Sequence, residues 1–332
     1  MFTHTSKSLF FRGFYIEIYL RIGKYLNKMR KNPNWFLMSI IGRFNFIRFI
    51  VKRTAQQPNI QHYNSYNSAS LPSKFSNIDT NTIAETLRKD GLYLGIRLPD
   101  NISQEILEFA YSTPCYANLN PQHGFLYSQK EHISQHQTLF TAQYFNTSLL
   151  CPAIAALGQD PKLLEIAGMY FDAKPVFTGS RLWWNFVVDD KKPYDSNQSI
   201  TFFHYDLDDY ACLRFFFYLT NVDINNGPHV CVRGSHSNKN FSHVVWPVKR
   251  RSDRDIAAYY GSENIITICG DKGFGFAEDT FCYHKATRPL TQDRLMLQIQ
   301  FAIHDYGLHN DLKDPSLLVN QSVSLPASTV SS

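Results

Sequence analysis

From about residue 176 onward, the chain consists of short apolar and aromatic runs separated by polar turns, a pattern typical of β-strands. The segments 189–193 and 225–228 are rich in the Asp, Asn, Gly and Pro residues that favour chain reversal. We therefore predict a mainly β fold with a cupin-like jelly-roll core, preceded by helices. The predicted strands are 176–178, 180–188, 200–205, 211–219, 229–232, 264–268, 273–277 and 295–303.

Helical spacing of apolar residues marks the region before these strands. Residues 79–91 begin with a capping Asp79, place Ile83 and Leu87 on one face, and end in Gly91. We predict further helices at 100–110 and 161–171, a short strand at 92–96, and loops with short elements over 114–150. A charged insertion at 237–262 contains a predicted helix at 253–259.

Residues 1–53 combine large apolar residues with eleven Lys or Arg and a single acid, Glu17, for a net charge of +10. The remainder, with 22 basic and 27 acidic residues, is mildly acidic. No apolar run reaches the roughly 18–20 residues that a membrane-spanning helix needs. We predict basic amphipathic helices broken near Pro33, which either lie on an anionic membrane surface or pack on the domain or on a partner chain with a solvated cationic face.

Composition divides the chain into four parts. These are the basic helices 1–53, a linker 54–78 rich in Gln, Asn, Ser and Pro, a domain 79–309, and a flexible polar tail 310–332. The basic segment has no recognised nucleic-acid-binding module, so we expect no nucleic-acid partner. The six cysteines are scattered, and no secretory signal is evident, which favours free thiols in a reducing compartment such as the cytoplasm.

Candidate chemistry centres on His204 and Asp206. Residues two apart on a strand point to the same face, so this imidazole and this carboxylate project side by side. One more histidine would complete the set of two histidines and one carboxylate that binds non-haem Fe(II). His284 is our candidate, because it follows a predicted strand and a turn at 278–280. Alone, a His-x-Asp pair is more often a hydrogen-bonded surface pair than a metal site.

A series of motifs strengthens this interpretation. They are Trp183-Trp184-Asn185, Phe203-His204-Tyr205-Asp206, Asn226-Gly227-Pro228-His229, Arg233-Gly234-Ser235-His236, His284 and Arg294. In order and spacing they resemble the phytanoyl-CoA dioxygenase family of Fe(II)/2-oxoglutarate oxygenases, over about residues 80–305. The resemblance implies a double-stranded β-helix with Fe(II) as cofactor and 2-oxoglutarate and O2 as co-substrates. It further implies that His204, Asp206 and His284 are metal ligands and catalytic residues, and that Arg294 pairs with a 2-oxoglutarate carboxylate.

Other site residues are less sharply defined by the sequence. Tyr218 and Thr220 share one strand face, and either contact 2-oxoglutarate or pack in the core. Trp184, Asn185 and Lys130 are candidate substrate contacts. Arg288 is a rival to Arg294, but it precedes a proline and is expected in a turn. His229 is expected to be a hydrogen-bonded turn histidine.

These features predict an oxidoreductase that hydroxylates a C–H bond of a small or lipid-like metabolite and releases succinate and CO2. Related iron halogenases replace the carboxylate with a small residue to admit chloride, so retention of Asp206 favours hydroxylation. The same iron site would also serve desaturation, epimerisation or cyclisation in a biosynthetic pathway. The alternative from another class is a non-catalytic jelly-roll binding protein held at a membrane by residues 1–53. The sequence leaves the oligomeric state open.

Overall fold

The computed structural model describes residues 32–55, 72–75, 77–188, 201–245, 250–309 and 311–320, together with Leu26, Met29 and Arg30. Most of the predicted linker, the first 25 residues of the predicted basic helices and the end of the predicted tail lie outside the described residues. Among the described residues, no helix has the length and apolar character needed to cross a bilayer.

The core consists of two antiparallel sheets. The larger sheet has the strand order β1-β9-β6-β11-β5-β4-β2-β3, and the smaller has the order β10-β7-β8. The strands are β1 (Leu92–Arg97), β2 (Cys115–Ala117), β3 (Gly124–Phe125), β4 (Thr141–Gln143), β5 (Val176–Asn185), β6 (Cys212–Tyr218), β7 (His229–Val232), β8 (Ile265–Ile268), β9 (Phe274–Glu278), β10 (His284–Ala286) and β11 (Arg294–Ala302).

The path of the chain between the sheets makes this fold a jelly roll. It runs from β5 in the large sheet to His204 beside β10, back to β6, and then to β7 and β8 in the small sheet. It returns to the large sheet at β9, crosses again to β10, and ends in β11 between β5 and β6. This alternation confirms the predicted fold class, a double-stranded β-helix with flanking helices.

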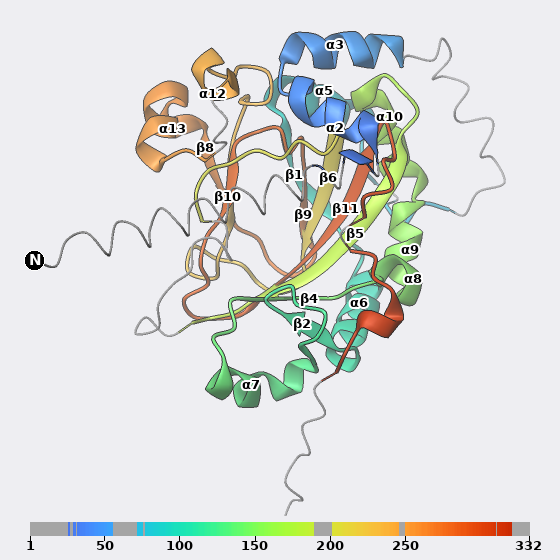
Figure 1. Cartoon of the computed structure of the whole chain (residues 1–332), viewed down its shortest axis with the longest axis vertical. Coiled ribbons are helices and arrows are strands. Elements are labelled where there is room, and N and C mark those ends of the chain that lie inside the picture. Colours follow the sequence, from blue (N-terminus) through green and yellow to red (C-terminus); the bar gives the residue numbers. More distant parts are fainter. Residues whose placement is uncertain are drawn as a thin grey trace, which may run out of the picture.

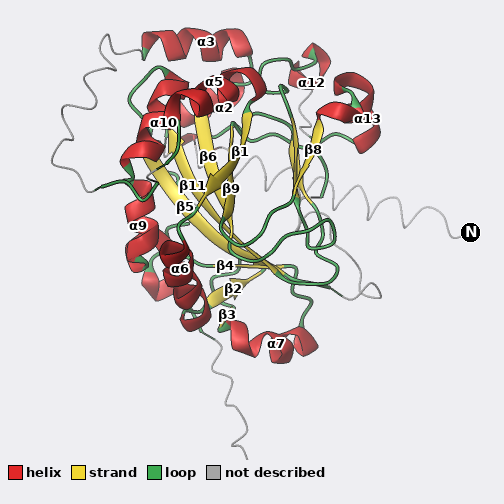
Figure 2. Ribbon diagram, turned by 180° about the vertical axis from the view of Figure 1, so that it is seen from behind, coloured by secondary structure: helices red, strands yellow, loops and turns green. Residues whose placement is uncertain are grey.

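Helices cover the outer face of the large sheet (Figures 1 and 2). The helices of the domain are α5 (Thr80–Asp90), α6 (Asp100–Ser112), α7 (Lys130–His136), α8 (Thr147–Leu150), α9 (Pro152–Gly158), α10 (Pro161–Phe171), α12 (Phe241–Val245) and α13 (Asp253–Tyr260). Short 3-10 turns lie at Tyr127–Gln129, Ser262–Asn264 and Pro315–Leu317. Local chemistry sets the helix ends: Asp79 accepts hydrogen bonds from the first turn of α5, and Gly91 ends it at φ +68°.

Two further helices, α2 (Pro33–Ile41) and α3 (Asn45–Thr54), lie at one end of the molecule (Figure 1). Asn32 caps α2 by accepting the Trp35 N–H at 2.9 Å, so the predicted break at Pro33 is the start of a helix. Met38 is fully buried in the main core. This part of the predicted basic segment therefore packs on the domain.

The large sheet has two different faces, because side chains alternate along each strand. Residues such as Phe215, Phe217 and Leu297 belong to the core under the helices. Their neighbours Phe216 and Met296 belong to a smaller apolar cluster that also contains Cys231 of the small sheet. The interior between the sheets is thus lined by alternate residues of β5, β6, β9 and β11.

The structure differs from the predicted elements in a few places. The predicted strand 200–205 is reduced to isolated bridges at Phe203 and His204, and its first residue is not described. Helices α7, α8, α9 and α12 were not predicted as helices; α8 and α12 have only four and five residues, too few for a helical period to show. Gly179, at φ +141°, lies beside a shift in the β5–β11 register, so the two predicted strands at 176–188 form one irregular strand.

Candidate metal centre

His204, Asp206 and His284 come together between the two sheets. His204 and His284 face each other across an antiparallel bridge, exchanging backbone hydrogen bonds of 3.0 and 2.8 Å. Asp206 follows on the same side, and its N–H donates to Thr280 O at 2.8 Å. One ligand atom from each of the three residues lies within 4.8 Å of the others, and no second group of this kind occurs in the described part of the chain.

Hydrogen bonds orient both imidazoles toward the carboxylate. The Nδ1 atoms lie 3.2 Å from Phe202 O in His204 and 3.0 Å from Cys282 O in His284. A carbonyl only accepts, so each Nδ1 carries the proton and each Nε2 keeps its lone pair. The Nε2 atoms of His204 and His284 lie 3.8 and 3.7 Å from the Asp206 oxygens. This tautomer leaves both Nε2 atoms free to bind a metal ion.

Arg214 of β6 holds the carboxylate. Its Nη1 donates to Asp206 Oδ2 at 2.5 Å, its other nitrogens donate to Asp208 and Gln300, and Arg181 lies close enough to contribute to the local charge. Burial alone would raise the pKa of Asp206, but Arg214 and the two histidines hold it well below its ordinary value. The carboxylate is therefore ionised over the whole physiological pH range, as a metal ligand must be.

Glu278 and His229 lie behind His284. Glu278 is fully buried at the end of β9, with one oxygen 3.1 Å from His284 Nδ1 and the other 2.7 Å from His229 Nε2. Burial opposes the charge, but the two histidines outweigh it and hold the pKa of Glu278 to about 2. The carboxylate stays ionised, and a carboxylate behind a ligating histidine orients the ring and raises its basicity.

Arg294, the first residue of β11, points into the same interior, and its side chain is buried. Its guanidinium donates to Gly227 O and, at 2.5 Å, to Asn185 Oδ1, while its Nε has no partner among the described residues. A buried guanidinium held by a neutral amide and a carbonyl keeps a full positive charge without a nearby carboxylate. Such a group is suited to an anionic ligand.

The other predicted site residues are distributed differently. The Tyr218 hydroxyl accepts from His229 N and donates to Ile268 O, so its hydrogen-bonding capacity is used within the protein. Thr220 Oγ1 accepts from Leu295 N at 3.2 Å. Asn185 reaches the interior and orients Arg294, whereas Trp184 lies on the opposite sheet face, stacked on Tyr127 at 4.2 Å.

Two more predicted contacts have partners of their own. Lys130 Nζ lies 2.7 Å from the buried carboxylate of Asp293 and 5.7 Å from the Phe186 ring. Arg288 donates to Val188 O. The Asp293 carboxylate thus neutralises the charge of Lys130. Neither Lys130 nor Arg288 contacts the three candidate ligands.

Sequence reasoning missed Arg214, Glu278 and the role of His229. Glu278 was placed in a turn, but it is the last strand residue of β9; His229 was expected in a turn, but it is the buried first residue of β7. The alternation Phe274, Phe276, Glu278 carried the signal, because it puts the carboxylate on the inward face. Its partner could not be found, because His229 lies 49 residues away in the chain.

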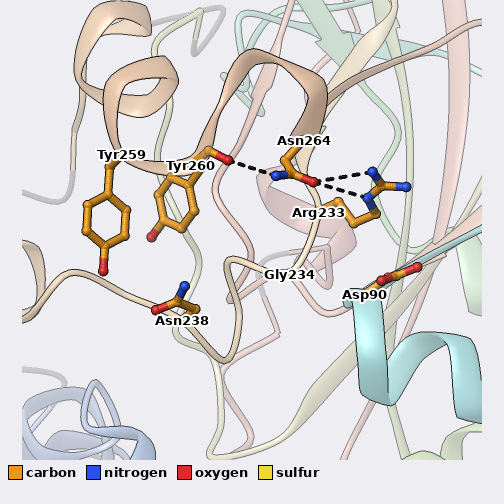
Figure 3. Close-up of a pocket in the computed structure, with 7 residues that line it drawn as sticks. All are labelled: Asp90, Arg233, Gly234, Asn238, Tyr259, Tyr260 and Asn264. Carbon is orange, nitrogen blue, oxygen red and sulfur yellow. Dashed lines mark hydrogen bonds between the residues drawn. The ribbon is translucent and has the colours of Figure 1, made fainter.

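A separate polar pocket of about 320 Å³ lies between the end of α5 and α13 (Figure 3). Arg233 and Asn264 are hydrogen bonded to each other at one side, and Tyr259 and Tyr260 line the other. The lining contains none of the three candidate ligands. This pocket is therefore distinct from the metal centre.

No family model matches the sequence, and no curated protein matches it. Solved structures with similar folds include the epimerase SnoN in complex with Fe3+, alpha ketoglutarate and nogalamycin RO (14% identity, 67% of this chain and 82% of that chain covered, TM-score 0.46). Another is HygX from Streptomyces hygroscopicus with nickel, 2-oxoglutarate and hygromycin B (14% identity, 67% of this chain and 86% of that chain covered, TM-score 0.45). A third is EctD from S. alaskensis with 2-oxoglutarate and 5-hydroxyectoine (14% identity, 70% of this chain and 80% of that chain covered, TM-score 0.44). With TM-scores below 0.5, these similarities carry no argument about ligand or reaction.

Proposed function

We propose that the protein is an Fe(II)- and 2-oxoglutarate-dependent dioxygenase, with His204, Asp206 and His284 as its metal ligands. The observation that carries the proposal is the orientation of the two imidazoles. Both use Nδ1 on a backbone carbonyl and turn Nε2 toward one ionised carboxylate. Two histidines and one carboxylate on one side of a metal suit Fe(II) and leave positions open for small ligands.

The charges of the interior support 2-oxoglutarate as the co-substrate. Arg214 is compensated by Asp206 and Asp208, whereas the buried Arg294 has no carboxylate partner among the described residues. One carboxylate of a dianion would supply the missing counter-charge of Arg294. We infer that Arg294 pairs with the distal carboxylate of 2-oxoglutarate. The N–H groups of a guanidinium lie side by side in one plane, and Asn185 fixes that plane.

Bound iron would supply the activation of O2 and the oxidative decarboxylation of 2-oxoglutarate to succinate and CO2. The protein's own residues do the positioning. Cys282 O accepts the Nδ1 proton of His284, and the Glu278 carboxylate 3.1 Å from that nitrogen raises the basicity of the ring. Arg214 keeps the Asp206 carboxylate in one orientation, and the surrounding aromatic residues Phe216 and Phe276 exclude water. We propose that the enzyme is of the phytanoyl-CoA dioxygenase type, because the sequence motifs around these residues resemble those of that family.

The reaction that we propose is hydroxylation of a C–H bond in a small or lipid-like metabolite. Asp206 is present, so the position that chloride takes in related halogenases is filled by a carboxylate. Desaturation, epimerisation and cyclisation need the same metal site, and analysis of the product distinguishes them from hydroxylation. The walls that would select the substrate include the segments 114–150 and 237–262.

The experiment that tests this function is an anaerobic titration of the purified protein with Fe(II) and 2-oxoglutarate. The proposal predicts a weak visible charge-transfer band that is absent in His204→Ala, and succinate formation when O2 and a pool of candidate metabolites are added. The folded state of both proteins is checked by near-ultraviolet circular dichroism. A folded wild-type protein without the band, or a band of equal strength in His204→Ala, would exclude the proposed site.

A further inference from the structure

Helix α3 is oriented against the usual rule for amphipathic helices, because two of its three charged side chains, Arg48 and Lys52, face the protein. Arg48 is buried, with its guanidinium 3.4 Å from Asp279 Oδ2 and 4.0 Å from the centre of the Phe281 ring. Lys52 donates to Tyr170 O at 3.2 Å and lies over the ring of the same residue, and burial lowers its pKa. The contacts of the buried Arg48 and the half-buried Lys52 fix which side of the helix faces the protein.

The opposite side of α3 is apolar and exposed. Phe46 and Phe49 are 71% and 56% exposed. The same end of the molecule also exposes Leu37, Ile40, Phe44 and Ile50 of α2, α3 and the turn between them. Six exposed large apolar residues within fourteen positions indicate an interaction surface rather than scattered surface residues. We call these six residues the α2–α3 apolar surface.

The charge around this surface restricts its partner. Arg53 lies 5.2 Å above the Phe49 ring and is itself exposed, and the chain has no acidic residue between Glu17 and Asp79. A second copy of the chain would offer the exposed Arg53 no acidic partner from the same surface. The preceding residues 1–25 carry four basic residues against one acidic residue, so they would add positive charge rather than neutralise it.

The place of the surface in the fold agrees with a flat partner. In two opposite views α3 is the outermost element at one end of the molecule, lying across it (Figures 1 and 2). We propose that the α2–α3 apolar surface docks on an anionic lipid membrane, with Phe46 and Phe49 entering the interface and Arg53 near the headgroups. This inference is independent of the reaction at the metal centre.

The test is co-sedimentation of the full-length protein with vesicles. Equimolar phosphatidylglycerol and phosphatidylcholine supply the anionic surface, and pure phosphatidylcholine the neutral one. We expect binding to the anionic vesicles, weakened by salt, and a reduction of roughly tenfold or more in the partition coefficient of the double variant Phe46→Asp/Phe49→Asp. Phe46→Ser/Phe49→Ser, which adds no negative charge, should also bind more weakly.

The matched control is Leu149→Asp/Leu150→Asp, which changes the charge equally at two exposed leucines on α8. This variant should bind like the wild type, and thermal unfolding verifies that all variants are folded. Three results would overturn the inference. They are no binding of the wild type to anionic vesicles, equal binding of the Phe46/Phe49 variants, and a wild-type dimer in sedimentation velocity that these variants lose.

Discussion

The buried pair of Glu278 and His284 offers a quantitative test of how the protein prepares its metal site. In Glu278→Gln the side chain keeps its shape and one oxygen acceptor but loses its charge. The variant therefore leaves the interior filled while removing the anion 3.1 Å from His284 Nδ1. A weaker metal site in a folded protein is the expected result.

The size of the effect follows from what remains around His284. Its Nδ1 retains Cys282 O at 3.0 Å, so the ring keeps its orientation and only its basicity falls. Loss of such outer partners typically costs 10–100-fold in metal affinity. We expect the lower half of this range, about tenfold to thirtyfold, which corresponds to roughly 1.4–2 kcal/mol of binding free energy.

The assay is an anaerobic Co(II) titration followed by the visible d–d bands, in competition with a chelating indicator. Asp279→Asn is the matched control, because Asp279 is the next residue and equally buried but contacts Arg48 and Tyr170 instead of a ligand. It should lower the free energy of unfolding and leave the dissociation constant for Co(II) within about twofold. Unchanged affinity in Glu278→Gln, or an equal loss in Asp279→Asn, would refute the reasoning.

Three further predictions concern the interior. Arg294→Lys loses the paired donors and should raise the dissociation constant for 2-oxoglutarate about tenfold or more in charge-transfer titrations, whereas Arg288→Lys should not. Burial lowers the pKa of Lys239 to about 7, while unfolded lysine titrates near 10.5. The unfolded chain thus binds this proton between pH 10 and 7 and the native state does not, so the lysine destabilises the fold increasingly as the pH falls. Contacts of the Lys239 ammonium with aromatic rings offset part of this destabilisation. Lys239→Met should therefore raise the free energy of unfolding by about 1–3 kcal/mol at pH 7 and by less at pH 10, measured by urea denaturation. Gly227→Ala should lower the free energy of unfolding by roughly 1–3 kcal/mol, because φ at this position is +71° and a Cβ would lie 2.9 Å from Pro289 N. An unchanged urea midpoint would contradict this prediction.

Local signals in the sequence predicted much of the fold. Asp79 and Gly91 fix the ends of α5, because capping and left-handed backbone depend on single residues. Strand alternation placed His204 and Asp206 on one face, although the structure shows bridges there rather than a full strand. The motif around His284 located the third residue of the site.

Contacts that depend on the tertiary path of the chain could not be predicted in the same way. Arg214 is only eight residues from Asp206, but their contact depends on how the chain turns between the bridge at His204 and β6. The face of α3 that packs on the domain could not be predicted either. Its sequence pattern predicts an amphipathic helix with the cationic face in solvent. Asp279 and Tyr170 reverse this orientation by holding Arg48 and Lys52 inside.

The central claim is that His204, Asp206 and His284 bind one metal ion. A crystal structure of protein loaded anaerobically with Fe(II), with diffraction data collected on both sides of the iron absorption edge, tests it most directly. We predict one strong anomalous peak within coordination distance of His204 Nε2, His284 Nε2 and an Asp206 oxygen, and no such peak in His204→Ala. A peak elsewhere, or an empty site in a fully loaded protein, would contradict the assignment.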